Sequence, residues 1–125
     1  MSKQIHPTSI IHNSSEIEDN VIIGPYSIIG PNVKINKNTK IHSHVIIVGN
    51  TTIGFNNEIY PFSAIGSDPQ HLKYDGKLTE LIIGNHNIFR EHVTIHPGTN
   101  VGTKKTIIGN NGFFMVGSHV AHDCI

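Results

Sequence analysis

The chain has 125 residues and a mass of 13.7 kDa, which corresponds to a single domain. Nine Lys and Arg residues balance nine Asp and Glu residues, so the net charge does not favour nucleic acid or an anionic membrane surface. No apolar run approaches the roughly eighteen residues that a membrane span needs. The N-terminus shows no signal-peptide pattern, and the single Cys124 cannot form an internal disulfide, which suits a reducing cytosol. Neither a nucleic-acid partner nor membrane insertion is expected.

A six-residue repeat runs through the first half of the chain. Isoleucine occupies eleven successive positions at intervals of six, from Ile5 to Ile65, although only 22 of the 125 residues are isoleucine. Gly often follows this Ile by one position and Pro by two, and the fourth position is small or β-branched, with Asn57 as the exception. Six is not a helical period, and the prolines would interrupt a helix. The repeat therefore predicts short strands separated by corners, with the Ile column buried in a narrow interior.

The repeat is interrupted twice and resumes in phase each time. The interruptions cover about 67–82 and 98–107, and we expect both to leave the regular scaffold as excursions. Loops that leave a rigid scaffold often carry function. The apolar column then continues in two further sets: Ile83, Phe89 and Ile95, followed by Ile108, Phe114 and Val120. We expect residues 1–125 to form one domain of stacked coils.

The register of the repeat brings three of the ten histidines together. His96 and His122 fall in the third hexapeptide of consecutive coils, and His119 ends the preceding hexapeptide. The three imidazoles are therefore predicted to converge on one edge of the prism. The histidines at other corners are expected to be solvated and without a role: His6, His12, His42, His44, His86 and His92.

The repeat resembles that of the hexapeptide-repeat transferases, in which three hexapeptides form one triangular coil. This resemblance implies an all-β fold, a left-handed parallel β-helix. Three segments make the resemblance more specific, because they are similar to segments of the UDP-N-acetylglucosamine 3-O-acyltransferases. Gly117–Cys124 resembles the active-site segment of that family, Thr94–Thr99 a second site segment, and Gln70–Tyr74 its substrate-contacting loop. Their order and spacing agree along essentially the whole chain.

The resemblance implies an enzyme that moves a (hydroxy)acyl chain from acyl carrier protein to the 3-hydroxyl of UDP-N-acetylglucosamine. This is the first step of lipid A biosynthesis, in the cytoplasm of a Gram-negative-type bacterium. His122 matches the general base, and Asp123 matches the group that orients its imidazole. Imidazole suits this role because its ordinary pKa of about 6.5 leaves much of it neutral near pH 7. The residues that match substrate contacts are His119, His96, Gln70, His71, Leu72 and Lys73.

The same resemblance implies a homotrimer with each active site between neighbouring prisms, and neither a cofactor nor a metal ion. It also implies further coils and a helical domain beyond Ile125, so we expect the domain to be truncated at its C-terminal end. One position departs from the family pattern: His71 stands where the family often has a substrate-contacting Asp. An imidazole there can accept a hydrogen bond, but a charged interaction would be lost.

Two other kinds of enzyme remain open. A γ-class carbonic anhydrase-like enzyme uses the same prism and binds zinc through three histidines shared across a subunit interface. The loop from Gln70 to Tyr74 has no role in that enzyme. Another hexapeptide sugar acyltransferase with a similar base is the second alternative. Metal analysis would separate the first and substrate profiling the second.

Overall fold

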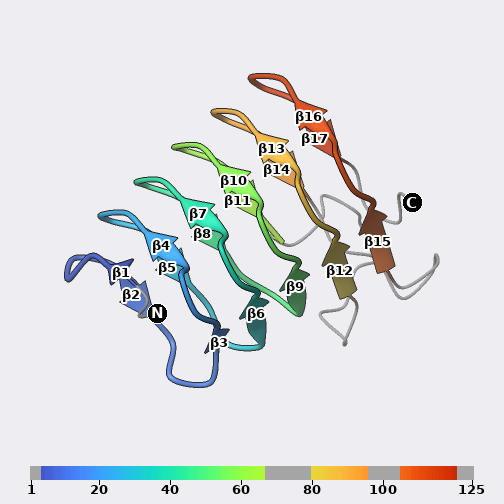
Figure 1. Ribbon diagram of the computed structural model, residues 1–125. Coiled ribbons are helices and arrows are strands. Elements are labelled where there is room, and N and C mark those ends of the chain that lie inside the picture. Colours follow the sequence, from blue (N-terminus) through green and yellow to red (C-terminus); the bar gives the residue numbers. More distant parts are fainter. Residues whose placement is uncertain (1–3, 67–79, 96–104, 121–125) are drawn as a thin grey trace, which may run out of the picture.

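The computed structural model describes residues 4–66, 80–95 and 105–120. Within these ranges the chain forms short strands and no helix, so none is present there that could span a membrane. The strands pair in parallel and make three sheets of six, six and five strands (Figure 1). These sheets, named A, B and C below, are the faces of a triangular prism. The architecture is the predicted left-handed parallel β-helix.

The chain visits sheets A, B and C in turn. Sheet A contains β1 (Gln4–Ile5), β4 (Ile22–Ile23), β7 (Lys40–Ile41), β10 (Glu58–Ile59), β13 (Ile88–Phe89) and β16 (Phe113–Phe114). Sheet B contains β2 (Ile10–Ile11), β5 (Ile28–Ile29), β8 (Ile46–Ile47), β11 (Ala64–Ile65), β14 (Thr94–Ile95) and β17 (His119–Val120). Sheet C contains β3 (Glu16–Ile17), β6 (Val33–Ile35), β9 (Thr51–Ile53), β12 (Glu80–Ile83) and β15 (Lys105–Ile108).

Successive coils stack in the register that the repeat predicts. Ile41 pairs with Ile23 on one side and with Ile59 on the other, so neighbours in regular coils are 18 residues apart. The register also crosses both interruptions, because Ile83 pairs with Ile53 before it and with Ile108 after it. These separations of 30 and 25 residues exceed a regular coil by twelve and seven residues. Both surplus segments fall between a strand of sheet B and a strand of sheet C.

The two predicted excursions lie mainly outside the described residues, at 67–79 and 96–104. Strand β12 already begins at Glu80 and β15 at Lys105, so the last residues of both predicted ranges belong to strands. The excursions themselves stay predictions.

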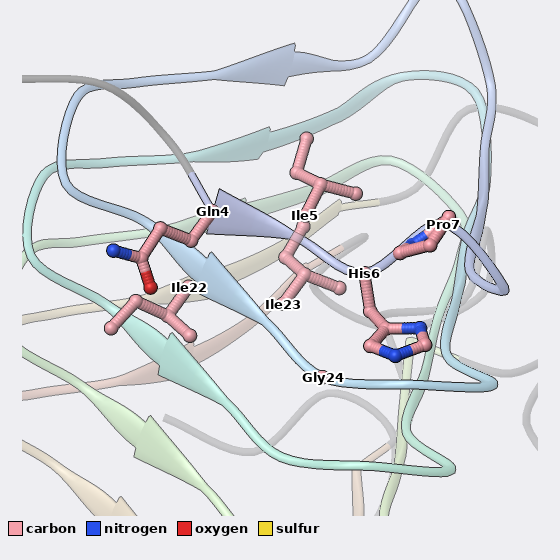
Figure 2. Close-up of a pocket in the computed structure, with 7 residues that line it drawn as sticks. All are labelled: Gln4, Ile5, His6, Pro7, Ile22, Ile23 and Gly24. Carbon is pink, nitrogen blue, oxygen red and sulfur yellow. The ribbon is translucent and has the colours of Figure 1, made fainter.

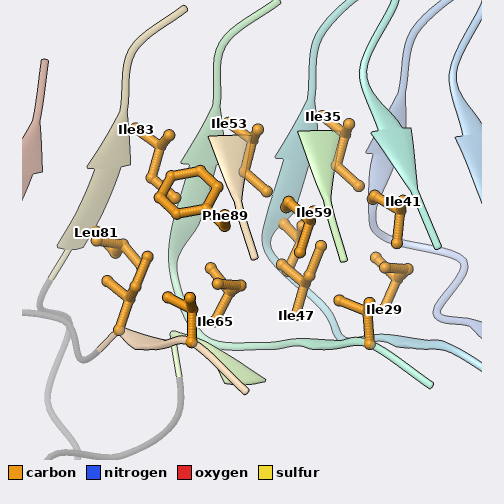
Figure 3. Packing of buried hydrophobic residues seen from close by; sticks show 14 of the residues in the cluster. Ile29, Ile35, Ile41, Ile47, Ile53, Ile59, Ile65, Leu81, Ile83 and Phe89 are labelled. Carbon is orange, nitrogen blue, oxygen red and sulfur yellow. The ribbon is translucent and has the colours of Figure 1, made fainter. Parts of the chain in front are cut away.

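The predicted isoleucine column forms the core. From Ile23 to Ile65 every isoleucine of the series is at most 1% exposed, and Phe89 continues the column with 0% exposure. Figure 3 shows these side chains packed against one another inside the prism. Because neighbours in the column are similar in size and shape, each coil fits the next with little space left over.

Polar residues of the small column satisfy the backbone at the corners. The Ser27 hydroxyl donates to the carbonyl of His42 at 2.9 Å, and the Thr39 hydroxyl donates to that of Gly54 at 2.9 Å. Asn57, the exception in the sequence pattern, does the same with its amide, which donates to the carbonyl of Gly84 at 2.8 Å. Buried backbone carbonyls at corners have no strand partner, so these side chains supply the missing donors.

The residue three places after the buried apolar residue has a left-handed backbone at most corners. Ten such residues are not glycine, with φ between 56° and 63°. Five are Asn, which tolerates this conformation, but Tyr26, His44, Phe62 and His92 also adopt it. Their rings stack along the edge between sheets A and B, with centroids 5.1 to 5.4 Å apart. This stack, called the aromatic ladder below, offsets part of the backbone strain.

Candidate active site

His119 lies in the last described coil, on the outward side of sheet B. Strand β17 pairs with β14 so that His119 is opposite Thr94 and Val120 is opposite Ile95. Val120 packs against the core, and successive strand residues point to opposite faces, so His119 points outward. Its side chain is exposed.

A short hydrogen bond ties His119 to the neighbouring coil. Thr94 Oγ1 and His119 Nδ1 are 2.6 Å apart. The backbone N–H of Thr94 also donates to the carbonyl of Ser118 at 3.0 Å. Thr94 therefore contacts both the strand that carries His119 and the imidazole itself. We did not single out Thr94 from the sequence, because its partner is 25 residues away across an interruption.

The other candidate residues lie outside the described residues, and their roles stay predictions: His122, Asp123, His96, Gln70, His71, Leu72 and Lys73. The predicted convergence of the three imidazoles is likewise untested by the described geometry. The described strands do show that Ile95 and Val120 are paired neighbours. In the sequence His96 follows the first directly and His122 follows the second by two.

The outward column of sheet B changes character along the prism. Its first three coils present aliphatic side chains that are 39 to 65% exposed. The column then becomes short and finally polar at the two coils nearest the predicted active-site segments. Its members in coil order are Ile10, Ile28, Ile46, Ala64, Thr94 and His119.

Several corner histidines are engaged rather than solvated, so the expectation that they are idle is wrong for them. His42 Nε2 is 2.8 Å from Glu58 Oε2, and the imidazole stacks on the Tyr60 ring with centroids 4.4 Å apart. The guanidinium of Arg90 lies 4.4 Å from the centroid of the same ring. Two more histidines belong to the aromatic ladder. An 18-residue spacing of aromatic residues three places after the Ile column would have indicated this.

Arg90 is held by its neighbour in sequence as well as by the tyrosine ring. Its Nε donates to Glu91 Oε1 at 3.0 Å. That side-chain hydrogen bond lowers the pKa of the Glu91 carboxyl below its ordinary value, and a backbone hydrogen bond adds to the effect. The guanidinium is thus already neutralised by a carboxylate, which makes it a poor candidate for binding an anionic substrate.

The described residues offer no competing centre for chemistry. Among them, no three His, Cys, Asp or Glu side chains are grouped so that they could hold a metal ion. A hollow lies between the first two coils, as Figure 2 shows, and it is lined mainly by apolar groups such as Ile5 and Ile22. It lies at the opposite end of the prism from His119 (Figure 1).

Comparisons with known proteins agree with the repeat and with the sequence of the site. Residues 14–49 match the family model described as bacterial transferase hexapeptide (six repeats). An acyl-[acyl-carrier-protein]–UDP-N-acetylglucosamine O-acyltransferase of Rickettsia bellii is 50% identical over 123 residues, which are 98% of this chain and 44% of the relative. The chain belongs to the UDP-N-acetylglucosamine acyltransferase (LpxA) family.

Solved structures of LpxA proteins match the described fold closely. LpxA of Moraxella catarrhalis has a TM-score of 0.94 and 53% sequence identity, over 96% of this chain and 47% of that one. LpxA of Acinetobacter baumannii has a TM-score of 0.95 and 51% identity, over 97% and 47%. The chain thus spans about half the length of the LpxA relatives that it matches.

Proposed function

We propose that this protein is an acyltransferase that moves a (hydroxy)acyl chain from acyl carrier protein to the 3-hydroxyl of UDP-N-acetylglucosamine. The observation that carries the proposal is 50% identity over 98% of the chain to relatives named for this reaction. The identity extends through the predicted loop and active-site segments, and is not limited to the repeat that many transferases share. The reaction would begin lipid A biosynthesis in the cytoplasm.

In the proposed mechanism His122 is the general base. Its neutral imidazole takes the proton of the sugar 3-hydroxyl as that oxygen attacks the thioester carbon. The carbon–sulfur bond then breaks, and the imidazolium returns the proton to the departing thiolate. Asp123 orients the imidazole and stabilises its protonated form. A positioned base of this kind accelerates such reactions typically by 10²–10⁴-fold.

The remaining candidate residues are proposed to hold the substrates. His119 and His96 would contact the nucleotide sugar, and Gln70, His71, Leu72 and Lys73 would line the path of sugar and acyl chain. We further propose a homotrimer in which sheet B faces a neighbouring prism. The support is that the outward column of sheet B is aliphatic and exposed over three coils before it reaches His119.

Mutation of His122 tests the proposal, in the protein expressed from its complete gene. The His122→Ala variant is expected to lose at least about 100-fold in kcat with an unchanged melting temperature, because it lacks the base. Asp123→Asn is expected to lose less, and His96→Ala to change KM more than kcat. His12→Ala, at an exposed corner of another coil, is the matched control and should behave like the parent.

Two results would contradict this assignment. A His122→Ala variant that keeps more than about a tenth of the parental kcat would remove the base from His122. Stoichiometric zinc together with carbonic anhydrase activity, and no acyl transfer, would favour the zinc enzyme instead.

A further inference from the structure

The contact between Thr94 and His119 is fixed by the strands that carry the two residues. The residues are directly opposite in the parallel pairing of β14 and β17, with Ile95 and Val120 paired beside them. Both backbones are therefore held at the strand spacing, and the 2.6 Å distance between Oγ1 and Nδ1 joins two short side chains on rigid elements. Thr also has a stiff χ1, which keeps its hydroxyl in place.

The identity of residue 94 is not explained by the strand alone. In the three aliphatic coils of the same outward column the residue is Ile, which suits an outward β-strand position equally well. A hydroxyl at position 94 adds one property that Ile lacks, which is the ability to bond to the imidazole in the next coil. This places the hydroxyl in the structure where a histidine needs orientation.

A neutral imidazole carries one proton, and the hydrogen bond made by one ring nitrogen determines which nitrogen holds it. A donor at Nδ1 leaves the proton on Nε2, at the far end of the ring. A nucleotide sugar presents mainly oxygen atoms that accept hydrogen bonds, so a histidine that contacts it serves best with N–H at its tip.

We infer that Thr94 is a positioning residue of the acyltransfer site, whose hydroxyl donates to Nδ1 of His119 and so directs the Nε2–H toward an oxygen of the nucleotide sugar. The inference rests on the proposed function, in which His119 contacts that substrate. Thr94 itself touches no reacting atom. Its effect is on substrate binding, and the general base acts independently of it.

The test compares three variants in the protein expressed from its complete gene. Thr94→Val keeps the shape of the side chain and removes the hydroxyl, whereas Thr94→Ser keeps the hydroxyl. Thr52→Val is the matched control, because Thr52 is also an outward threonine within a strand, on sheet C. We expect Thr94→Val to raise KM for UDP-N-acetylglucosamine about two- to twelvefold, the value of one hydrogen bond, with kcat within about twofold. Thr94→Ser and Thr52→Val should keep the parental KM.

A second measurement reads the hydrogen bond without turnover. Nitrogen NMR of ¹⁵N-labelled protein reports which nitrogen of His119 is protonated, with His119→Gln used to assign the signals. The parent should show the Nε2–H tautomer, and Thr94→Val a mixture of both. Melting temperatures within a few degrees of the parent would show that each variant folds.

Each outcome bears on the inference. An active parent in which Thr94→Val changes neither KM nor tautomer would overturn the role of Thr94 alone. A parent with the Nδ1–H tautomer would also overturn it, because the hydroxyl would then be the acceptor. A folded parent without acyl transfer would overturn the proposed function and the inference with it.

Discussion

Single residues in this fold are constrained chiefly by the residues one coil away. Ile41 is 1% exposed and lies between Ile23 and Ile59 in the interior column. Ile41→Asp would bury a carboxylate without a partner, and we expect it to destabilise the prism by several kcal/mol, on the order of the whole stability of a small domain. Ile41→Val removes one methylene and should cost about 0.5–1.5 kcal/mol. Urea unfolding monitored by circular dichroism measures both, and equal midpoints for the two variants and the parent would refute the register.

Gly66 shows a second kind of constraint on a single residue, set by backbone conformation. Its φ is +80°, and a Cβ added there would collide with the carbonyl oxygen of Val48 in the preceding coil. Gly109 follows the column residue Ile108 just as Gly66 follows Ile65, yet a Cβ at Gly109 meets nothing within 4 Å. We expect Gly66→Ala to cost about 1–3 kcal/mol and Gly109→Ala much less. Thermal melting of the two variants provides the comparison, and a Gly66→Ala protein as stable as Gly109→Ala would show that the corner relaxes.

At the scale of elements, the corners are held together by side-chain amides as much as by the strands. Asn87 is fully buried; its amide donates to the carbonyl of Gly109 at 2.8 Å and its Oδ1 accepts from the N–H of Gly112 at 2.7 Å. Its backbone N–H in turn donates to Oδ1 of Asn57 at 2.9 Å, which continues the same device into the preceding coil. Two coils are thereby joined at a point where no strand hydrogen bond is available.

Loss of this amide should be expensive relative to loss of an exposed one. Asn87→Ala leaves a carbonyl and an N–H without their side-chain partner, so we expect a loss of about 1–3 kcal/mol in the free energy of unfolding. Asn13→Ala, at an exposed corner, is the control and should stay within about 0.5 kcal/mol of the parent. Hydrogen exchange at Gly112 gives a local readout: unchanged protection in Asn87→Ala would mean that another acceptor replaces the amide.

For the whole molecule, the question is which face meets another copy. The proposed trimer uses sheet B, where Ile46 is 41% exposed in the middle of the aliphatic part of the outward column. A charge placed there would have to be buried in the interface, so Ile46→Lys is expected to convert the trimer into monomers without unfolding the prism. Thr52→Lys, at an outward position of sheet C, should remain trimeric. Light scattering after size exclusion, on the protein from its complete gene, measures both. A trimer that survives Ile46→Lys would exclude sheet B as the interface.

Much of the architecture was predictable because the fold repeats one local rule. Each hexapeptide places an Ile in the interior and turns a corner, so eleven isoleucines at intervals of six define strand positions, coil size and stacking order before any tertiary contact is known. The pairing of Ile53 with Ile83, and of that residue with Ile108, shows that the phase of the column predicts register even across interruptions. The family was likewise predictable, because the segments that carry the resemblance are short and contiguous in sequence.

The tertiary structure decided the contacts that join residues at irregular separations. The role of Asn57 depends on a carbonyl 27 residues away, and the bond between Thr94 and His119 spans 25 residues. Neither distance is a multiple of the repeat, since both depend on how many residues the interruptions contain. The strain of an aromatic residue such as Phe62 in a left-handed corner becomes acceptable only when rings from adjacent coils stack on it. Local pattern thus determined the scaffold, because each hexapeptide has the same preference. Stacking of the coils determined the corners and the orientation of His119, because their partners exist only once the coils are in place.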